Sequence, residues 1–272
     1  MSSSSPALRL VHNGALRPAD AALLTASDGL AVCGRGVFET IAAYRGIPFL
    51  LESHLERLRR GAEVFSLACP DDAAIRQAIG QVLDANDLLA EKARVRVTLS
   101  SPADGRESWW VEATPPPPHP PKARVITGPF VRNERSLLAG LKTINYGDNV
   151  VALAAARRAG ADEALFANSR DELCEGTWSN VFVRIDGRWM TPPLSSGCLP
   201  GITRELVIRL FAEQAIPFAE STLSYAALDR VESAFLTSSL REIQPVAAID
   251  GRDLENAAEM IILQSAYRWL TA

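Results

Sequence analysis

The sequence predicts a mixed α/β (α+β) fold with two domains. Short segments rich in β-branched and aromatic residues alternate with segments whose apolar residues recur at helical spacing. Both halves of the chain contain both kinds of segment, which is typical of α/β and α+β folds. The length of 272 residues suits two domains of average size.

A proline-rich stretch marks the expected domain boundary. Its sequence is TPPPPHPPKA, residues 114–123. Consecutive prolines neither donate to a sheet nor continue a helix, and they favour an extended, semi-rigid conformation. We therefore expect a small N-terminal domain over residues 1–113, a linker over 114–123 and a C-terminal domain over 124–272.

Strands and helices are expected in turn along the N-terminal domain. GVFETIAAYRG at 36–46 predicts a strand followed by a turn, and ARVRVTLSS at 93–101 alternates as a strand does. Ser53 suits the N-cap of a helix, and residues 71–85 predict a second helix. Apolar residues after Ser53 fall on one helical face, namely Leu55, Leu58, Ala62 and Phe65.

The C-terminal domain is expected to mix helices with short strands broken by turn residues. Helices are expected at 149–158 and 203–214, the second directly after a glycine. The segments that predict strands are EALFAN at 163–168, NVFVRIDG at 180–187, RWMTPP at 188–193, SAFLTSS at 233–239 and IQPVAAIDG at 243–251.

Composition and charge exclude several classes of protein. The net charge of −4 argues against nucleic-acid binding, and no apolar run is long enough to span a membrane. The serine-rich start, residues 1–10, has no signal-peptide pattern, and we expect a frayed tail there. Four scattered cysteines without a CxxC pair indicate reduced, partly buried thiols, as in a cytoplasmic protein. Three separated histidines without HExxH predict no metal site.

Lys142 lies shortly before a predicted helix and is a candidate catalytic residue. Catalytic lysines commonly form a Schiff base with a carbonyl, most often that of pyridoxal phosphate. This cofactor requires a carboxylate near its pyridine nitrogen and a phosphate cup of backbone amides, hydroxyls and an arginine. Taken singly, the candidates are better explained as solvated or helix-starting residues. They are Glu175, Gly201-Ile202-Thr203, Ser238, Ser239 and Arg57.

The order of these segments resembles the class IV aminotransferase family, the fold type IV pyridoxal-phosphate enzymes. The resemblance runs from about Asp28 to about Asp250. It rests on GRGVFET, HLERL, LKTINY, ADEAL, ELCEGTWSNVF, MTPPL, LPGITR and FLTSSLREIQPV, in family order. The family includes branched-chain and D-amino-acid aminotransferases, R-selective amine transaminases and 4-amino-4-deoxychorismate lyase.

The resemblance implies two α/β domains with pyridoxal 5'-phosphate between them, in a homodimer whose partner completes the substrate pocket. It makes Lys142 the Schiff-base lysine and proton shuttle, and it pairs Glu175 with the pyridinium nitrogen. It places Tyr146 near the ring oxygen, and Phe38 and Thr40 at the border of the substrate pocket. The resemblance assigns phosphate binding to Arg57, the Ile202 and Thr203 amides and the Ser239 hydroxyl, with Ser238 next to Ser239.

Four positions bear on substrate choice. Arg35 stands where the family often has Asp, and we favour a solvated side chain there. Trp178 replaces a usual Gly or Ser, so its indole either narrows the pocket or packs under the loop. Relatives that grip a carboxylate with an arginine have it near Ser101, whereas Arg96 resembles the arginine of the branched-chain enzymes or faces outward.

The sequence therefore favours an aminotransferase that moves an amino group between an amino acid or amine and a keto acid. The alternative is 4-amino-4-deoxychorismate lyase, which eliminates pyruvate and gives 4-aminobenzoate. Thr40 and FLTSSLREIQPV favour the lyase, and the missing arginine at Ser101 counts against it. A non-catalytic cofactor-binding protein is a third hypothesis, against which the combined presence of Lys142, Glu175 and Arg57 argues.

Overall fold

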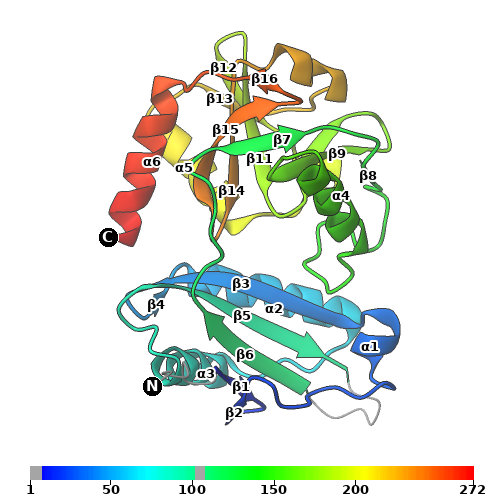
Figure 1. Cartoon of the computed structure of the whole chain (residues 1–272), viewed down its shortest axis with the longest axis vertical. Helices are drawn as coiled ribbons and strands as arrows, with labels where there is room; N and C mark the ends of the chain where they lie inside the picture. Colours follow the sequence, from blue (N-terminus) through cyan, green and yellow to red (C-terminus); the bar gives the residue numbers. More distant parts are fainter. Residues whose placement is uncertain (1–7, 102–107) are drawn as a thin grey trace. The chain divides into compact units, whose positions relative to one another are not determined.

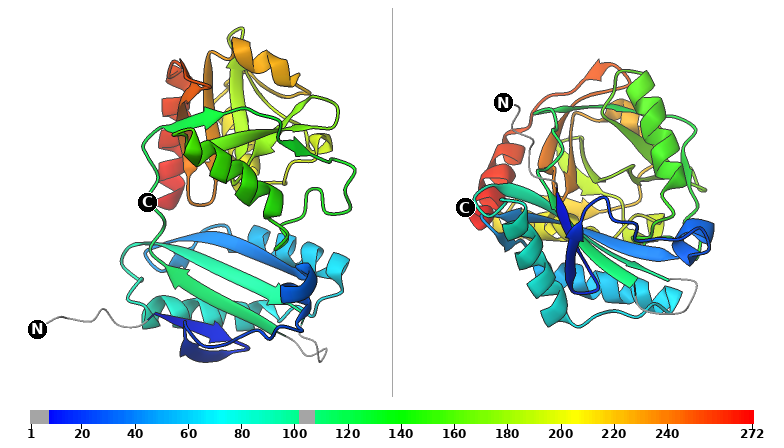
Figure 2. Two further views of the ribbon diagram at one scale, coloured as in Figure 1. Left: turned by 45° about the vertical axis from the view of Figure 1, so that its right-hand side comes forward. Right: turned by 60° about the horizontal axis from the view of Figure 1, so that its bottom comes forward.

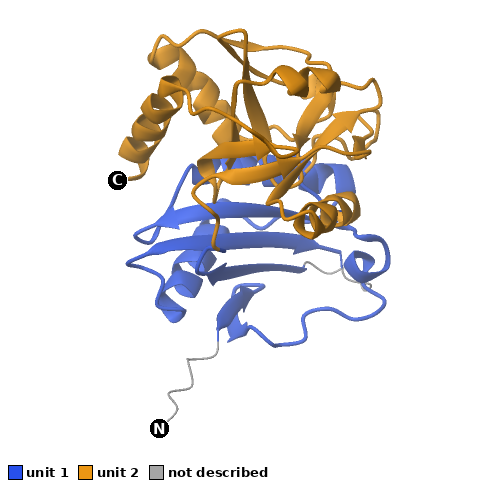
Figure 3. Cartoon of the chain, turned by 45° about the horizontal axis from the view of Figure 1, so that its top comes forward, with its two compact units in different colours: residues 1–117, 142–145 blue, residues 118–141, 146–272 orange. Residues whose placement is uncertain are grey.

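The computed structural model describes residues 8–101 and 108–272, and it divides the chain into two compact units (Figures 1 and 3). Unit 1 ends at Pro117 and also includes Lys142–Asn145, whereas unit 2 consists of Pro118–Leu141 and Tyr146–Ala272. The division at Pro117 falls inside the proline-rich stretch. The serine tail expected before residue 8 lies outside the described residues. The mixed α/β class is confirmed.

Unit 1 is an antiparallel sheet with two long helices on one face (Figure 2). The sheet has the order β2-β1-β6-β5-β3-β4. Its strands are β1 Arg9–His12, β2 Ala15–Pro18, β3 Gly36–Tyr44, β4 Ile47–Pro48, β5 Lys92–Ser100 and β6 Ser108–Thr114. The helices are α1 Gly29–Cys33, α2 Leu51–Phe65 and α3 Asp72–Ala85, of which α2 packs on β3 and α3 on β6 and β1.

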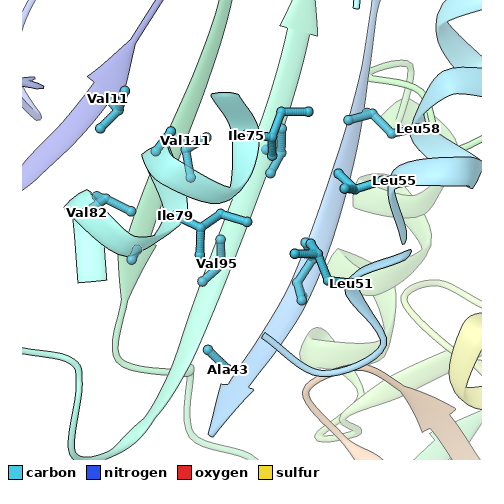
Figure 4. Close-up of a cluster of buried hydrophobic side chains, with 14 of the residues drawn as sticks. Val11, Ala43, Leu51, Leu55, Leu58, Ile75, Ile79, Val82, Val95 and Val111 are labelled. Atoms are coloured by element: carbon cyan, nitrogen blue, oxygen red, sulfur yellow. The ribbon is translucent and has the colours of Figure 1, made fainter. Parts of the chain in front are cut away.

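Alternation along the strands decides which side chains enter the core of unit 1. Val37, Ile41 and Ala43 of β3 belong to a buried cluster with the apolar faces of α2 and α3 (Figure 4). The same face of β5 contributes Val95 and Val97. The alternate residues of these two strands therefore lie on the opposite face of the sheet, which is where the pocket candidates are found.

The two long helices of unit 1 begin differently from each other. Asp71 caps α3 and its carboxylate accepts a hydrogen bond from the Ala74 amide at 2.7 Å, as residues 71–85 predict. The expectation that Ser53 caps α2 is wrong, because that helix already begins at Leu51. Its N-cap is Leu50, whose left-handed backbone (φ 52°) turns the chain from β4 into the helix three residues before the expected start.

Unit 2 is built on a mixed sheet with three helices. Ten strands belong to it within the described residues, in the main order β10-β9-β7-β15-β14-β11-β12-β13, with β16 beside β15 and β8 beside β9. The strands are β7 Ala123–Ile126, β8 Val131–Arg132, β9 Glu163–Asn168, β10 Leu173–Gly176, β11 Asn180–Ile185, β12 Arg188–Thr191, β13 Phe218–Glu220, β14 Ser233–Ser238, β15 Glu242–Ile249 and β16 Arg252–Asp253. The helices are α4 Gly147–Arg158, α5 Ile202–Glu213 and α6 Ala258–Thr271, with 3₁₀ turns η1 Leu194–Ser196 and η2 Tyr225–Arg230.

The predicted polar residues of unit 2 lie at three places where strands or helices begin or end. Glu175 lies near the end of β10, Gly201 directly precedes α5, and Ser239 lies in the turn between β14 and β15. Strands β11 and β14 are neighbours and pair Asn180 with Thr237, and α5 packs against β14. Within the described part of the chain, no helix has the length and apolar character that crossing a membrane requires.

Candidate active site

Lys142 lies in an extended segment that adds to the edge of β3. The Phe38 amide donates to the Lys142 carbonyl at 3.1 Å, and the Ile144 amide donates to the Gly36 carbonyl at 3.0 Å. Between these bonds Val37 and Thr143 form an antiparallel bridge. Helix α4 begins only at Gly147, so the sheet edge, rather than a helix, fixes the backbone of the lysine. Its Nζ lies 4.3 Å from the centre of the Phe38 ring.

Arg57 is held by a buried carboxylate that the sequence did not single out. Its Nε and Nη2 donate to Glu39 at 2.7 and 2.8 Å, and His54 Nδ1 lies 2.7 Å from the same carboxylate. All three side chains are buried. Two of the five N–H donors of the guanidinium are used in this fork, which sets the plane of Arg57. The spacing of three residues puts His54 and Arg57 on one face of α2, a signal that could have linked them in advance.

The charges of this cluster act on its two titratable members. Burial raises the pKa of Glu39, but the charge of Arg57 and hydrogen bonds from Arg57 and His54 outweigh burial and hold that pKa at about 2. Burial lowers the pKa of His54, and the charges of Arg57 and Lys142 lower it further against the opposing effect of Glu39. The arrangement therefore consists of an ionised glutamate, an arginine and a neutral histidine.

Phe38, Thr40 and Arg96 lie on the sheet face opposite the helices. The Arg96 guanidinium carbon is 3.7 Å from the centre of the Phe38 ring, and its Nε donates to the Thr98 hydroxyl at 3.3 Å. Thr40 is the direct cross-strand partner of Arg96. Two cationic side chains, Arg96 and Lys142, therefore lie against the Phe38 ring. A cation–π contact with this ring stabilises the position of Arg96.

Glu175 is the penultimate residue of β10, and its carboxylate is held from two directions. Its Oε2 accepts a hydrogen bond from the Leu199 amide at 2.9 Å, and its Oε1 lies 3.4 Å from Arg132 Nε. Arg132 stacks on Phe166 at 4.5 Å and donates to Asn149 Oδ1 at 3.1 Å. Arg132 was not anticipated, because it lies more than forty residues before Glu175 in the chain and no sequence spacing links the two.

The start of α5 has the features of an anion site. Gly201 is its N-cap, and no side chain among the described residues caps the first amides, which belong to buried Ile202 and Thr203. A Cβ on Gly201 would clash with Asn180 Oδ1. The Asn180 amide group in turn donates to the Leu199 carbonyl at 2.9 Å. Leu199 thus joins the start of α5 to Glu175.

The serine turn after β14 completes the polar side chains predicted in unit 2. Ser238 Oγ accepts a hydrogen bond from the Arg241 amide at 3.2 Å, and half-buried Ser239 follows it in the turn. Beside them the buried Thr237 hydroxyl, on the strand position paired with Asn180, has no hydrogen-bond partner among the described residues. A phosphate group that brings acceptor oxygens to this end of β14 fits these hydroxyls.

Two of the unusual residues have definite neighbours. Trp178 remains 40% exposed and packs on Tyr146 with 5.0 Å between the ring centres, so it is not buried under its loop. The expectation that the Arg35 side chain is solvated is wrong. This side chain donates twice to the Phe65 carbonyl, at 3.1 and 3.3 Å, and thereby satisfies the last turn of α2.

The predicted residues therefore form two groups, one in each unit. Unit 1 brings Lys142, Phe38 and Arg96 together, and it joins Arg57 to Glu39. Unit 2 links Glu175 to the start of α5, and separately pairs Tyr146 with Trp178. An amine, a fixed carboxylate and uncapped amides with hydroxyls form the donor set that a phosphorylated pyridine aldehyde requires, so the residues present fit pyridoxal phosphate.

Comparison with known proteins establishes the family. The family model described as amino-transferase class IV matches residues 36–249. The chain belongs to the class IV aminotransferase family, whose members are enzymes and use pyridoxal phosphate.

The relatives include both transferases and a lyase. A Methanocaldococcus jannaschii protein assigned as a branched-chain-amino-acid aminotransferase is 31% identical over 260 residues, which is 92% of this chain and 90% of the relative. The D-alanine aminotransferase of Bacillus licheniformis is 28% identical over 92% of each chain. The aminodeoxychorismate lyase of Bacillus subtilis is 28% identical over 88% of this chain and 85% of the relative.

Two solved structures are similar over almost the whole chain. The branched-chain aminotransferase of Thermoproteus uzoniensis, solved with norvaline, has a TM-score of 0.89 at 27% identity, covering 97% of this chain and 94% of that one. The fold IV-transaminase of Curtobacterium pusillum has a TM-score of 0.84 at 30% identity, covering 97% and 99%. The fold of this chain is therefore that of fold type IV aminotransferases.

Proposed function

We propose that the protein is a pyridoxal-phosphate-dependent aminotransferase that moves an amino group between an amino acid or amine and a keto acid. The family match and the transferase relatives support this reaction. We further propose that it works as a homodimer, as the resemblance implies, and that it is cytoplasmic, as its scattered cysteines predict.

The observation that carries the proposal is the position of Glu175 beside the start of α5. The carboxylate accepts a hydrogen bond from the Leu199 amide, and the uncapped amides of Ile202 and Thr203 follow three and four residues later. A carboxylate and an anion site connected in this way match the two ends of a phosphorylated pyridine.

Each residue then has a role in the proposed mechanism. Pyridoxal phosphate, when bound, supplies an electron sink for the bond changes at the substrate Cα. Lys142 Nζ would bind the cofactor. As a shuttle between Cα and the cofactor, it would take a proton from the Cα of the amino donor in the first half-reaction and deliver one to the Cα of the second substrate in the return half-reaction. Glu175 holds a proton at the pyridine nitrogen, while Arg132 and the Leu199 amide keep its carboxylate in place.

The phosphate and the substrate are assigned to the remaining residues. Arg57, oriented by Glu39, and the hydroxyls at Ser238 and Ser239 join the α5 amides in holding the phosphate. Phe38, Thr40 and Trp178 form walls of the substrate pocket, and Tyr146 stands near the ring oxygen. Arg96, held on Phe38, supplies a cation for a substrate carboxylate.

A second function, 4-amino-4-deoxychorismate lyase, is favoured by one specific observation. The Bacillus subtilis lyase matches most of the chain at an identity close to that of the D-alanine aminotransferase. The lyase would use the same lysine and the same cofactor. The distinction therefore depends on which substrate the pocket accepts.

The test uses the visible spectrum of the cofactor-loaded protein with a panel of donors. A transferase loses its visible band with an amino acid or amine and regains it with a keto acid. A lyase forms 4-aminobenzoate and pyruvate from 4-amino-4-deoxychorismate without a second acceptor. A Lys142→Ala variant should lose the visible band, whereas Lys122→Ala, which alters an exposed lysine of the proline-rich stretch, should keep it. A protein that takes up no cofactor would refute both functions.

A further inference from the structure

The ADEAL segment contains a buried carboxylate to which the proposed function gives no role. Glu163 begins β9 and is fully buried. Its Oε1 accepts hydrogen bonds from the Ala164 amide at 3.1 Å, from the Thr177 amide at 2.9 Å and from the Thr177 hydroxyl. Its Oε2 accepts from the Trp178 amide at 3.3 Å and from the Ser179 hydroxyl at 3.1 Å. The Glu163 carboxylate therefore accepts hydrogen bonds from each of the three residues between β10 and β11, Thr177, Trp178 and Ser179.

The backbone of this loop is shaped to admit the carboxylate. A Cβ on Gly176 would lie 3.2 Å from both Cγ and Cδ of Glu163, which is closer than most such contacts. From another direction Asn149 Nδ2 donates to the Thr177 carbonyl at 2.5 Å. Thr177 and Ser179 are buried with the carboxylate. The Thr177 amide also donates to the Ala164 carbonyl at 3.1 Å, so removal of the carboxylate would take its acceptor from the Thr177 and Ser179 hydroxyls and the Trp178 amide.

The Glu163 carboxylate also pairs with Arg241, a residue of the turn after β14 that is proposed to bind the phosphate. Arg241 Nη2 lies 3.3 Å from Glu163 Oε2, and its Nη1 donates to Gln244 Oε1 at 2.5 Å. Its backbone amide donates to the Ser238 hydroxyl at 3.2 Å. Arg241 thus belongs to the turn after β14 while its side chain pairs with Glu163. The pair is buried, so it is screened little by solvent.

We propose that Glu163 and Arg241 form a positioning pair that holds the Glu175 loop and the Ser238–Ser239 turn at a fixed separation. The inference rests on the proposed function, in which those two segments bind the pyridine nitrogen and the phosphate of one cofactor. Neither member of the pair contacts the reacting atoms. Their effect is on the affinity and the protonation of the bound cofactor, because both depend on where Glu175 and the turn lie.

The test is a double-mutant cycle on cofactor binding. Apoprotein is titrated with pyridoxal phosphate for the wild type, Glu163→Gln, Arg241→Gln and the double variant. We expect each single variant to weaken binding about tenfold, and the double variant also about tenfold rather than about a hundredfold, because both changes break one network. The visible band should change its pH dependence in the same three variants, which a loss of stability alone would not cause.

Matched controls come from an exposed ion pair of the same unit. Arg230 and Asp186 pair at 2.5 Å on the surface, and Arg230→Gln and Asp186→Asn should bind pyridoxal phosphate as the wild type does. Wild-type affinity in both single variants, or losses that multiply in the double variant, would overturn the inference. If Glu163→Gln does not fold, Arg241→Gln alone decides. A loss of affinity of about tenfold with an altered pH dependence of the visible band supports the pair, and wild-type affinity with an unchanged spectrum overturns it.

Failure of this inference is distinct from failure of the proposed function. A wild-type apoprotein that does not bind pyridoxal phosphate would refute the function itself. A wild-type protein that binds, with Glu163→Gln and Arg241→Gln variants that bind equally well and keep its spectrum, would refute the positioning pair alone.

Discussion

Replacement of Gly201 by alanine should damage the anion site at the start of α5. The new Cβ would overlap Asn180 Oδ1 and lie 3.1 Å from Asn180 Cγ and 3.2 Å from Arg204 Cβ. Asn180 is buried on β11, and its short side chain is bound to the Leu199 carbonyl. It can yield only by giving up that hydrogen bond, or the start of α5 must move.

The magnitude follows from these two costs. A lost hydrogen bond costs about 0.5–1.5 kcal/mol, and overpacking of a well-filled site costs about 1–3 kcal/mol. We therefore expect the free energy of unfolding of Gly201→Ala to fall by about 1.5–4.5 kcal/mol, the sum of these two ranges. Affinity for pyridoxal phosphate should fall at least about tenfold, because the amides of Ile202 and Thr203 move with the helix start.

The assay combines denaturant unfolding of the apoprotein with a cofactor titration. Gly80→Ala is the matched control, since Gly80 lies within α3 and a Cβ there meets nothing within 4 Å. That control should be stabilised by about 0.5–1 kcal/mol and should bind the cofactor normally. A Gly201→Ala protein with unchanged stability and unchanged affinity would refute the close approach of Asn180 and the phosphate role of the α5 amides.

Three other predictions concern unit 1. Glu39→Gln should destabilise the protein by about 3–5 kcal/mol at neutral pH, because it breaks a buried pair and leaves Arg57 without its carboxylate. The folded pKa of Glu39 is lowered from 4.5 to about 2, so its stabilising effect is complete above pH 4.5 and is lost as pH falls toward 2. Urea unfolding of both proteins across this range should show the difference shrink, and a constant difference would contradict the lowered pKa. Arg57→Lys should weaken cofactor binding in a spectroscopic titration, because an ammonium cannot reproduce the two-pronged contact with Glu39; affinity equal to that of Arg60→Lys, an exposed neighbour, would count against the phosphate role. Arg35→Ala should lower the melting temperature slightly, by the loss of about 0.3–1 kcal/mol at the end of α2, and an unchanged melting temperature would show that this contact contributes nothing.

Local patterns were sufficient where a segment's own residues decide its structure. Helix α3 begins where Asp71 can cap it, and strands β3 and β9 cover the alternating or apolar runs that predict them. The start of α2 was missed because Leu50 adopts a left-handed backbone, which nothing in a leucine side chain indicates. The sequence did not predict the hairpin of β1 and β2 either, because β2 has only four residues and all of them are exposed.

The candidate site was predictable in its chemistry and not in its supporting contacts. The family order of motifs indicated Lys142, Glu175 and Arg57. The residues that hold them come from distant parts of the chain, as Glu39 and Arg132 do, and sequence spacing has no bearing on such pairs. Glu163 stood within a recognised motif, but its hydrogen bonds to the loop after Glu175 depend on the pairing of β9 with β10.

The most direct test of the central claim is the identification of the lysine that binds the cofactor. The chain has three lysines, Lys92, Lys122 and Lys142. Borohydride reduction of the cofactor-loaded protein, followed by peptide mass spectrometry, reports which of them carries a phosphopyridoxyl group. We predict the group on Lys142 and not on the other two. A modified Lys92 or Lys122 with Lys142 unmodified, or a protein with no modified lysine, would contradict the account.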